Sequence, residues 1–251
     1  MKFASLGSGS EGNALLVASG ATHVLMDCGF GLKDTLARLA RLGICAEQLS
    51  GIVVTHEHGD HIGGVARLAR KYKLPVWLTH GTSRSLTDIA ELHEIDSHQS
   101  FAINDLEITP YPVPHDAAEP VQFVFNDGAK RLGVLTDTGC STAYIEQVLS
   151  GCDALVLECN HDSQLLTNGN YPYSLKQRVS GRLGHLNNQD AAGILGRLDI
   201  SRLQHLVAAH LSRNNNTAEL AVRALSSVLN CDAGWVGVAT QEEGLAWREI
   251  F

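Results

Sequence analysis

The sequence has no apolar run that approaches the ~18 residues needed to cross a membrane. Its N-terminus lacks the long apolar segment of a secretory signal, so we expect neither a membrane partner nor export. The six cysteines form no C-x-x-C pair. This favours free thiols in a reducing cytoplasm over a disulfide framework or a zinc ribbon.

Pro- or Ser-rich linkers, charge blocks, low-complexity segments and repeats are also absent. With 44% hydrophobic and 18% charged residues, the chain can bury a large core, and we expect one domain over residues 1–251. The net charge of −8 argues against a protein that coats nucleic acid by bulk attraction. It does not exclude a phosphate substrate, because a metal centre adds local positive charge.

The pattern of apolar residues predicts an α/β fold with two sheets in the middle and helices outside. Strands are expected at residues 2–6, 14–18, 22–27, 51–55, 76–78, 106–112, 122–125, 131–136, 154–158, 204–209, 234–238 and 245–248. Helices are expected at residues 32–42, 62–73, 143–149, 174–181, 189–197 and 217–229.

Three histidines and two carboxylates lie within six positions where the strand 51–55 ends, in Thr55-His56-Glu57-His58-Gly59-Asp60-His61. His56 and His58 are two apart in an extended segment, so both can point to one side. Asp60 and His61 follow a turn, which provides a second pair. Imidazole and carboxylate ligands suit Zn, Mn or Fe, so the motif predicts two adjacent metal ions rather than a His-rich surface turn.

Further ligand types follow other predicted strands: His115, Asp137 and His210. A carboxylate such as Asp137 can bridge two cations that lie roughly 3.5–4 Å apart. Each residue alone is more often an ordinary hydrogen-bonded side chain than a metal ligand. Their occurrence together with the His56 motif favours a dinuclear site.

The segment Thr55-His56-x-His58-x-Asp60-His61 resembles the signature of the metallo-β-lactamase superfamily. The resemblance implies a four-layer αββα sandwich of two mixed sheets with a dinuclear site at one edge. It further implies that His56, His58 and His115 hold one metal and that Asp60, His61 and His210 hold the other. Asp137 would bridge the two metals, and Asp27 would support a ligand loop by hydrogen bonding.

Motifs over nearly the full chain are similar to the YycJ/WalJ-like branch, which is related to ribonuclease Z. They are Ser8-Gly9-Ser10-Glu11-Gly12-Asn13, Glu158-Cys159-Asn160-His161-Asp162, Tyr171-Pro172-x-x-Leu175-Lys176-x-Arg178, Gly184-His185-Leu186-x-Asn188 and His210-Leu211-Ser212-Arg213-Asn214-Asn215. Glu11 and Asn187 depart from the small polar residues usual there. The resemblance implies 5′→3′ exonuclease action on double-stranded DNA with a 5′-phosphorylated end.

The expected chemistry is hydrolysis of a phosphodiester by a hydroxide that bridges two metals. Asp60 would orient that hydroxide. His185 is the candidate proton donor to the leaving oxygen, and Glu158 would fix its tautomer and raise its pKa. The same Glu/His pairing is implied by the resemblance to ribonuclease Z. On the residues alone, His185 fits equally well as a helix-entry residue bonded to backbone.

Candidate substrate contacts surround these groups. The Ser8–Asn13 loop would present backbone N–H groups and hydroxyls to a terminal phosphate, although a plain β-turn is an alternative. Lys176 and Arg178 would contact phosphates or occupy a solvated helix face. The full set of candidates is Ser8, Ser10, Asn13, Asn160, His161, Lys176, Arg178, Ser212, Asn214 and Asn215.

Three alternatives to the DNA exonuclease stay open. A small cyclic or ribose phosphodiester substrate agrees with the negative net charge. A thioesterase of the glyoxalase II type would use the same ligands, but a thiolate leaves without a proton donor such as His185. A non-catalytic metal-dependent sensor would have closed sites with four protein ligands each, whereas here the ligands are shared between two ions.

Overall fold

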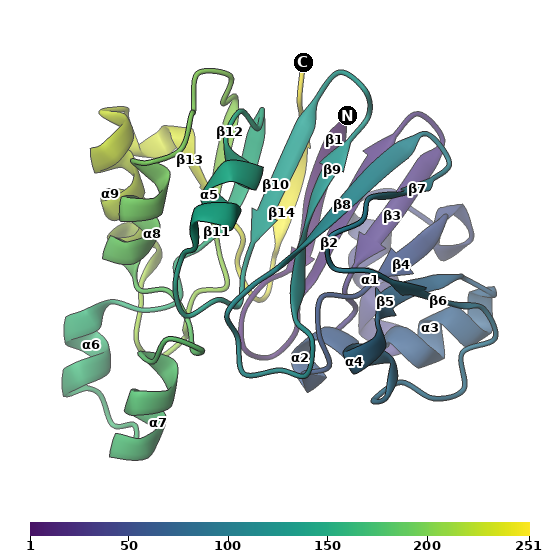
Figure 1. Cartoon of the computed structure of the whole chain (residues 1–251), viewed down its shortest axis with the longest axis horizontal. Coiled ribbons are helices and arrows are strands. Elements are labelled where there is room, and N and C mark those ends of the chain that lie inside the picture. Colours follow the sequence, from purple (N-terminus) through teal and green to yellow (C-terminus); the bar gives the residue numbers. More distant parts are fainter.

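The computed structural model describes all 251 residues as two seven-stranded sheets packed face to face between helices (Figure 1). The first sheet, in spatial order, contains β14 (Leu245–Glu249), β1 (Lys2–Gly7), β2 (Ala14–Ser19), β3 (Thr22–Met26), β4 (Gly51–Val53), β5 (Val76–Thr79) and β6 (Leu92–Ile95). The second contains β13 (Val236–Val238), β12 (His205–Ala209), β11 (Ala154–Glu158), β10 (Arg131–Leu135), β9 (Val121–Asn126), β8 (Leu106–Pro112) and β7 (Phe101–Ile103).

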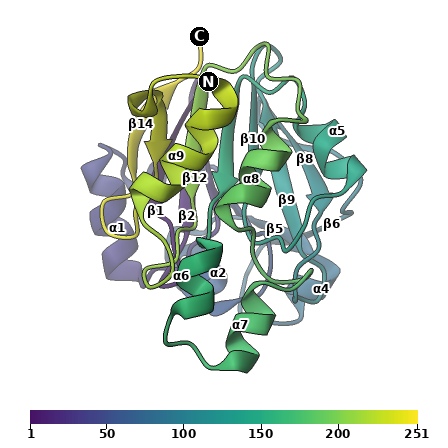
Figure 2. The same ribbon diagram turned by 90° about the vertical axis from the view of Figure 1, so that its left-hand side faces the viewer.

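Helices cover the outer face of each sheet, which confirms the predicted αββα sandwich. The first sheet is covered by α1 (Leu32–Arg41), α3 (Val65–Tyr72) and the short α4 (His80–Ser83). The second is covered by α5 (Ala143–Leu149), α8 (Asn188–Leu195) and α9 (Ala218–Leu229). The remaining helices are α2 (Gly59–Ile62), α6 (Ser163–Asn168) and α7 (Tyr173–Val179). In Figure 2, α6 and α7 extend below the sheets. No helix combines the length and apolar character needed to span a bilayer.

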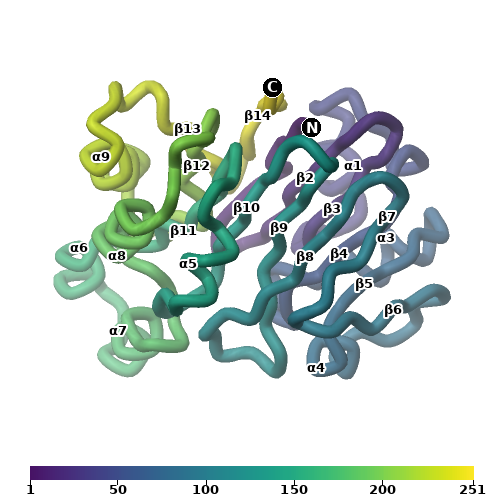
Figure 3. Tube along the Cα trace, turned by 45° about the horizontal axis from the view of Figure 1, so that its top comes forward, coloured from purple at the N-terminus to yellow at the C-terminus, as the bar shows by residue number.

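Strand alternation explains the three apolar layers. On β9, Phe123 and Phe125 belong to the cluster between the sheets, whereas Val124 packs in the layer under the outer helices. Both faces of each sheet are therefore covered, and central strands such as β3 and β11 are buried along their whole length. Figure 3 shows the N-terminal half of the chain on one side and the C-terminal half on the other, with β14 returning beside β1.

The carboxyl ends of the inner strands meet at one edge of the sandwich. Strands β3 to β6 are mutually parallel, as are β10 to β13. Loops that follow these strands therefore gather at the same edge, the lower one in Figure 1. This is the edge at which active sites of such sheets form.

Several boundaries differ from the sequence predictions. The predicted helix 62–73 begins instead at Val65 as α3, and the short helix α2 precedes it; between them the Gly64 N–H donates to the Cys28 carbonyl at 2.7 Å and not to the Asp60 carbonyl one helical turn back. The strand predicted at 51–55 ends at Val53. Five helices and strands were missed, namely α2, α4, α6, β6 and β7, and so were the 3₁₀ turns at Ala46–Gln48 and Ala233–Trp235. Of these, β6 reads Leu-His-Glu-Ile with both central residues exposed, so it lacks an apolar pattern.

Candidate metal centre

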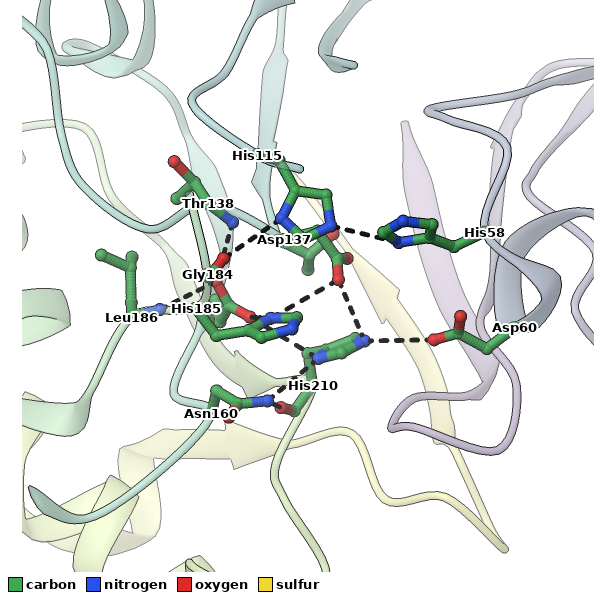
Figure 4. A network of polar contacts seen from close by, with 12 residues as sticks. His58, Asp60, His115, Asp137, Thr138, Asn160, Gly184, His185, Leu186 and His210 are labelled. Carbon is green, nitrogen blue, oxygen red and sulfur yellow. Dashed lines mark hydrogen bonds and ion pairs between the residues drawn. The ribbon is translucent and has the colours of Figure 1, made fainter. Parts of the chain in front are cut away.

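All seven side chains predicted to bind metal converge at this edge. Figure 4 shows His58, Asp60, His115, Asp137 and His210 among them. They come from the loops after β4, β8, β10 and β12, which are far apart in the sequence. The set is His56, His58, Asp60, His61, His115, Asp137 and His210.

One group of three imidazoles forms the first donor set. His56 Nε2 lies 3.0 Å from His58 Nδ1, and His58 Nδ1 lies 3.3 Å from His115 Nε2. Ligands 2.0–2.1 Å from a tetrahedral zinc ion are roughly 3.3 Å from one another. These three nitrogens therefore have the mutual spacing of ligands around one ion.

A second donor set lies beside the first and shares a carboxylate with it. The Asp60 Oδ2 atom lies 3.5 Å from His61 Nε2 and 3.7 Å from His210 Nε2. The two oxygens of Asp137 point to different neighbours, with Oδ2 3.4 Å from His61 Nε2 and Oδ1 3.3 Å from His210 Nε2. Asp137 also groups with His56 of the first set, so it stands between the two.

Two buried atoms of this cluster have no hydrogen-bond partner: Asp137 Oδ2 and His210 Nε2. Buried polar atoms are almost always satisfied, and leaving one unpaired costs about 1–3 kcal/mol. Both atoms point at neighbouring donor atoms in the cluster. The imidazole and carboxylate chemistry and these orphaned atoms all fit divalent metal binding.

Asp27 holds the ligand loop in the form that binds metal. Its Oδ1 accepts a hydrogen bond from the Thr55 backbone N–H, and its Oδ2 accepts from the Thr55 hydroxyl, each at 2.9 Å. His61 Nδ1 donates to the same Oδ2 at 2.8 Å, and His56 Nδ1 lies 2.9 Å from the Thr55 hydroxyl oxygen. Since that hydroxyl donates to Asp27, it must accept from His56. Both imidazoles therefore carry their proton on Nδ1 and leave Nε2 free.

His115 is oriented in the same way. His115 Nδ1 donates to the Gly184 carbonyl oxygen at 3.1 Å, which leaves its Nε2 free. Three site residues, Asp27, Asp137 and His210, have left-handed backbones with φ of 61°, 51° and 55°. Such conformations cost about 1–3 kcal/mol each outside glycine and cluster at functional sites.

The charges of these groups are strongly coupled. Burial disfavours the protonated imidazole of His210, but the carboxylates of Asp137 and Asp60 outweigh this and raise its pKa to about 9. Burial also opposes protonation of His61, yet Asp137 and Asp27 raise its pKa well above the ordinary value. Burial would raise the pKa of Asp60, but the neighbouring imidazoles of His210 and His61 outweigh this and hold it far below its usual range. A divalent cation would replace these protons, so metal binding must release them.

Beside the donor sets, Glu158 and His185 form the predicted pair. Glu158 is completely buried, and its Oε1 accepts from His185 Nδ1 at 2.8 Å. Its Oε2 accepts from the backbone N–H groups of Thr138 and Leu186 at 3.1 and 3.2 Å. Burial lowers the pKa of His185, but Glu158 outweighs that effect and raises it above the ordinary value. The ring is thereby fixed with Nε2 as the free nitrogen.

Four of the seven donor residues, His58, Asp60, Asp137 and His210, line a cavity of about 370 Å³. His185 and residues of α7 also line it. Of the ten predicted substrate contacts, only Ser10 and Arg178 line it. The Nε atom of Arg178 donates to Asp116 Oδ2 at 2.6 Å, and this pairing holds the pKa of Asp116 below its usual value.

Ser8 and Asn13 are the first and last residues of the predicted phosphate-binding loop. Both are buried, and their polar atoms form hydrogen bonds within the chain. The Ser8 hydroxyl oxygen accepts from the His210 backbone N–H at 2.9 Å. Asn13 donates through Nδ2 to Asp60 Oδ2 at 3.2 Å, and its backbone N–H donates to the Asp60 carbonyl at 2.8 Å. The two residues thus tie together two ligand loops, and their predicted contact with phosphate stays a prediction.

Four more residues that were predicted to contact substrate either form hydrogen bonds within the chain or line a different hollow. Asn160 is buried and donates to the His210 carbonyl oxygen at 3.0 Å. Asn215 is buried beside the Ser212 hydroxyl. His161 and Lys176 line a separate hollow on the far side of α7. The remaining two, Ser212 and Asn214, line a hollow of about 290 Å³ that adjoins the metal cavity through Ser10 and Tyr171.

Three residues that line the metal cavity or support its loops were not among the predicted site residues. Tyr171 and Asp116 line the cavity. Glu57, between two ligand histidines, accepts from the Ala118 backbone N–H at 2.7 Å and so joins the His56 loop to the His115 loop. The position of a carboxylate inside the histidine motif was a usable signal for Glu57. Tyr171 begins the motif Tyr171-Pro172-x-x-Leu175-Lys176-x-Arg178, but that motif does not show that its side chain lines the cavity, which depends on where α7 packs.

Comparison with known proteins agrees with this geometry. A profile of the beta-lactamase superfamily domain matches residues 22–210. The exodeoxyribonuclease YycJ of Bacillus anthracis is 37% identical over 95% of this chain and 93% of its own length. The chain belongs to the metallo-β-lactamase superfamily. Within it, the exodeoxyribonuclease WalJ of Streptococcus pneumoniae is 34% identical over 94% of this chain and 91% of its own, which confirms the YycJ/WalJ-like branch.

Solved structures of the superfamily agree on the fold. The metallo-β-lactamase-fold protein YhfI of Bacillus subtilis superposes with a TM-score of 0.75 over 99% of both chains at 18% identity. Family membership and the clustered histidines and aspartates establish a metal-dependent hydrolase.

Proposed function

We propose that the chain is a dinuclear-metal phosphodiesterase that removes nucleotides from the 5′ end of double-stranded DNA. In this proposal His56, His58 and His115 hold one divalent ion, and Asp60, His61 and His210 hold the other. Asp137 would bridge the two ions, since it groups with His56 of the first set and its oxygens lie 3.4 Å from His61 Nε2 and 3.3 Å from His210 Nε2 of the second. Zn, Mn or Fe would each suit these ligands.

The Glu158–His185 pair is the observation that carries this proposal. Cleavage of a phosphodiester expels an alkoxide, which needs a proton as it leaves. The Glu158 carboxylate at 2.8 Å fixes the His185 tautomer and favours its protonated form, so that Nε2–H is available on the cavity side. A thioester hydrolase has no need of this pair, because a thiolate leaves unprotonated.

The chain's own groups supply orientation and charge. When bound, the two cations would lower the pKa of attacking water and offset charge that grows on the phosphate oxygens. The side chain of Asp60 is 24% exposed and can accept a hydrogen bond from the attacking water. Arg178 at the mouth offers guanidinium N–H groups besides the one that it gives to Asp116.

DNA is preferred as the substrate because the relatives that match over nearly the whole chain are named exodeoxyribonucleases. We also propose that residues 1–251 act as one domain. All six cysteines are free, which agrees with a cytoplasmic site of action. A cavity of about 370 Å³ admits a single nucleotide unit rather than an intact duplex, so a small cyclic or ribose phosphodiester is the alternative substrate.

The test is digestion of end-labelled duplex DNA, with a 5′-phosphate or a 5′-hydroxyl, by protein loaded with Zn or Mn. We expect release of mononucleotides from the 5′ end and loss of that activity in Asp137→Asn. The matched control is Asp34→Asn on the exposed face of α1, which should digest as the wild type does. Inertness toward DNA with rapid hydrolysis of a cyclic nucleotide would refute the DNA assignment.

A further inference from the structure

The two opposite faces of α7 line two different hollows. Leu175, Arg178 and Val179 face the metal cavity. The face defined by Tyr173, Lys176, Gln177 and Ser180 lines a second hollow of about 270 Å³. At 100° per residue these two sets point in nearly opposite directions. The helix contains no buried residue, so it acts as a wall between two open spaces rather than as part of the core.

The second hollow has a composition suited to a nucleic acid strand. No Asp or Glu lines it, although the chain carries a net charge of −8. Lys176 supplies positive charge there, and it donates only one identified hydrogen bond, to the Thr167 carbonyl at 2.7 Å. The other polar groups are neutral: His161, Ser163, Thr167, Tyr173, Gln177, Ser180 and Asn187.

An unusual aromatic side chain stands at the entrance of this hollow. Tyr173, the first residue of α7, is 77% exposed, more than any other large apolar or aromatic side chain except the C-terminal Phe251. Aromatic rings offer stacking surfaces on which any nucleobase can lie. Two residues earlier, Tyr171 lines the metal cavity, so the segment that begins α7 reaches both spaces.

We propose that the hollow between α6 and α7 receives the complementary strand of the DNA end and that α7 stands between the two strands. This rests on the proposed exonuclease function. The cleaved strand must reach the donor residues that line the metal cavity, which a whole duplex cannot enter. Its partner must therefore leave it at the cavity mouth. An α-helix is thick enough to separate strands, since with side chains it just fits the ~12 Å major groove.

In this arrangement Tyr173 stacks on a base of the complementary strand and Lys176 contacts its phosphates. The assignment also explains why Lys176 lies outside the metal cavity while Arg178, two residues later, lies inside it. Figures 1 and 2 show α6 and α7 together, beyond the end of the sheets.

The experiment measures kcat/KM on a 5′-phosphorylated strand, once in a duplex and once alone. The variants are Tyr173→Ala and Lys176→Glu, with Lys33→Glu on the exposed face of α1 as the matched charge control. We expect the duplex to single-strand ratio to fall about tenfold in both variants, because each removes a contact made only by the complementary strand. Lys33→Glu should leave the ratio unchanged.

A second measurement places the strand directly. With 5-iodouracil in the terminal bases of the complementary strand, irradiation should produce a crosslink that Tyr173→Ala removes. Unchanged ratios in both variants, or a Tyr173-dependent crosslink only from the cleaved strand, would overturn this inference and leave the exonuclease standing. Wild-type protein that hydrolyses bis(p-nitrophenyl) phosphate but neither form of DNA would instead overturn the proposed function.

Discussion

Asp27→Asn should weaken metal binding although Asp27 is not itself a predicted ligand. Asp27 accepts hydrogen bonds from Thr55 N–H, Thr55 O–H and His61 Nδ1–H at 2.8–2.9 Å. Asparagine has only one accepting oxygen, so its NH₂ group must face at least one of these donors. If it faces His61, the ring moves its proton to Nε2, the nitrogen needed for the metal.

The magnitude follows from these bonds. Loss of a group that orients a metal-binding histidine typically costs about 10–100-fold in affinity, which is about 1.4–2.7 kcal/mol. A buried donor left unsatisfied should also lower the free energy of unfolding of the metal-free protein by about 1–3 kcal/mol. The backbone should not contribute, because asparagine tolerates the left-handed conformation of Asp27 at φ of 61°. Alanine would add a backbone cost, so asparagine is the cleaner change.

The assay is competition for zinc against a chelator of known affinity, with metal-free unfolding in urea as the second readout. The matched control is Asp34→Asn, which removes only an exposed i,i+4 ion pair with Arg38 and should change neither quantity by a measurable amount. Zinc affinity in Asp27→Asn equal to that of the wild type would refute the role of Asp27 in fixing the His61 tautomer.

Three further predictions follow from the same contacts. His185→Ala should slow nucleotide release by about 10²–10⁴-fold but affect hydrolysis of bis(p-nitrophenyl) phosphate far less, since nitrophenolate leaves without a proton; equal losses would remove the proton-donor role. Ser8→Ala leaves the buried His210 N–H without a partner and should lower the free energy of unfolding by about 1–3 kcal/mol in urea; an unchanged midpoint would contradict this. When the free metal concentration is 1,000 times the Kd, removal of the metal by a chelator should lower the Tm of the protein by roughly 8–16 °C. A Tm that chelation leaves unchanged would show that metal does not bind the folded state.

Much of the fold and of the set of metal-binding residues could be predicted from the sequence, because both depend on local patterns. The strands β10 and β11 have continuous apolar runs, and β8 begins with alternating buried and more exposed residues. The motif from His56 to His61 places its ligands within one short segment. His115, Asp137 and His210 could be proposed because each follows such a strand. Their convergence required the order of the sheets, which the family resemblance implied.

The substrate contacts were less predictable because side-chain direction and helix packing decide them. Nothing local shows that Asn13 reaches back to Asp60 while the neighbouring Ser10 faces the cavity. Likewise, Lys176 and Arg178 are separated by about 200° around α7 and therefore serve different spaces. The break between α2 and α3 also coincides with a tertiary contact, from the Gly64 N–H to the Cys28 carbonyl.

The central claim is that two divalent ions bound at the Asp137 cluster produce phosphodiester hydrolysis. The most direct measurement adds metal stepwise to metal-free protein and records the rate of phosphodiester hydrolysis at each step. Native mass spectrometry gives the number of ions bound per chain at the same steps. We expect the rate to reach its maximum at two ions per chain and to vanish when the ions are removed. A full rate with one ion per chain, or with none, would contradict the account.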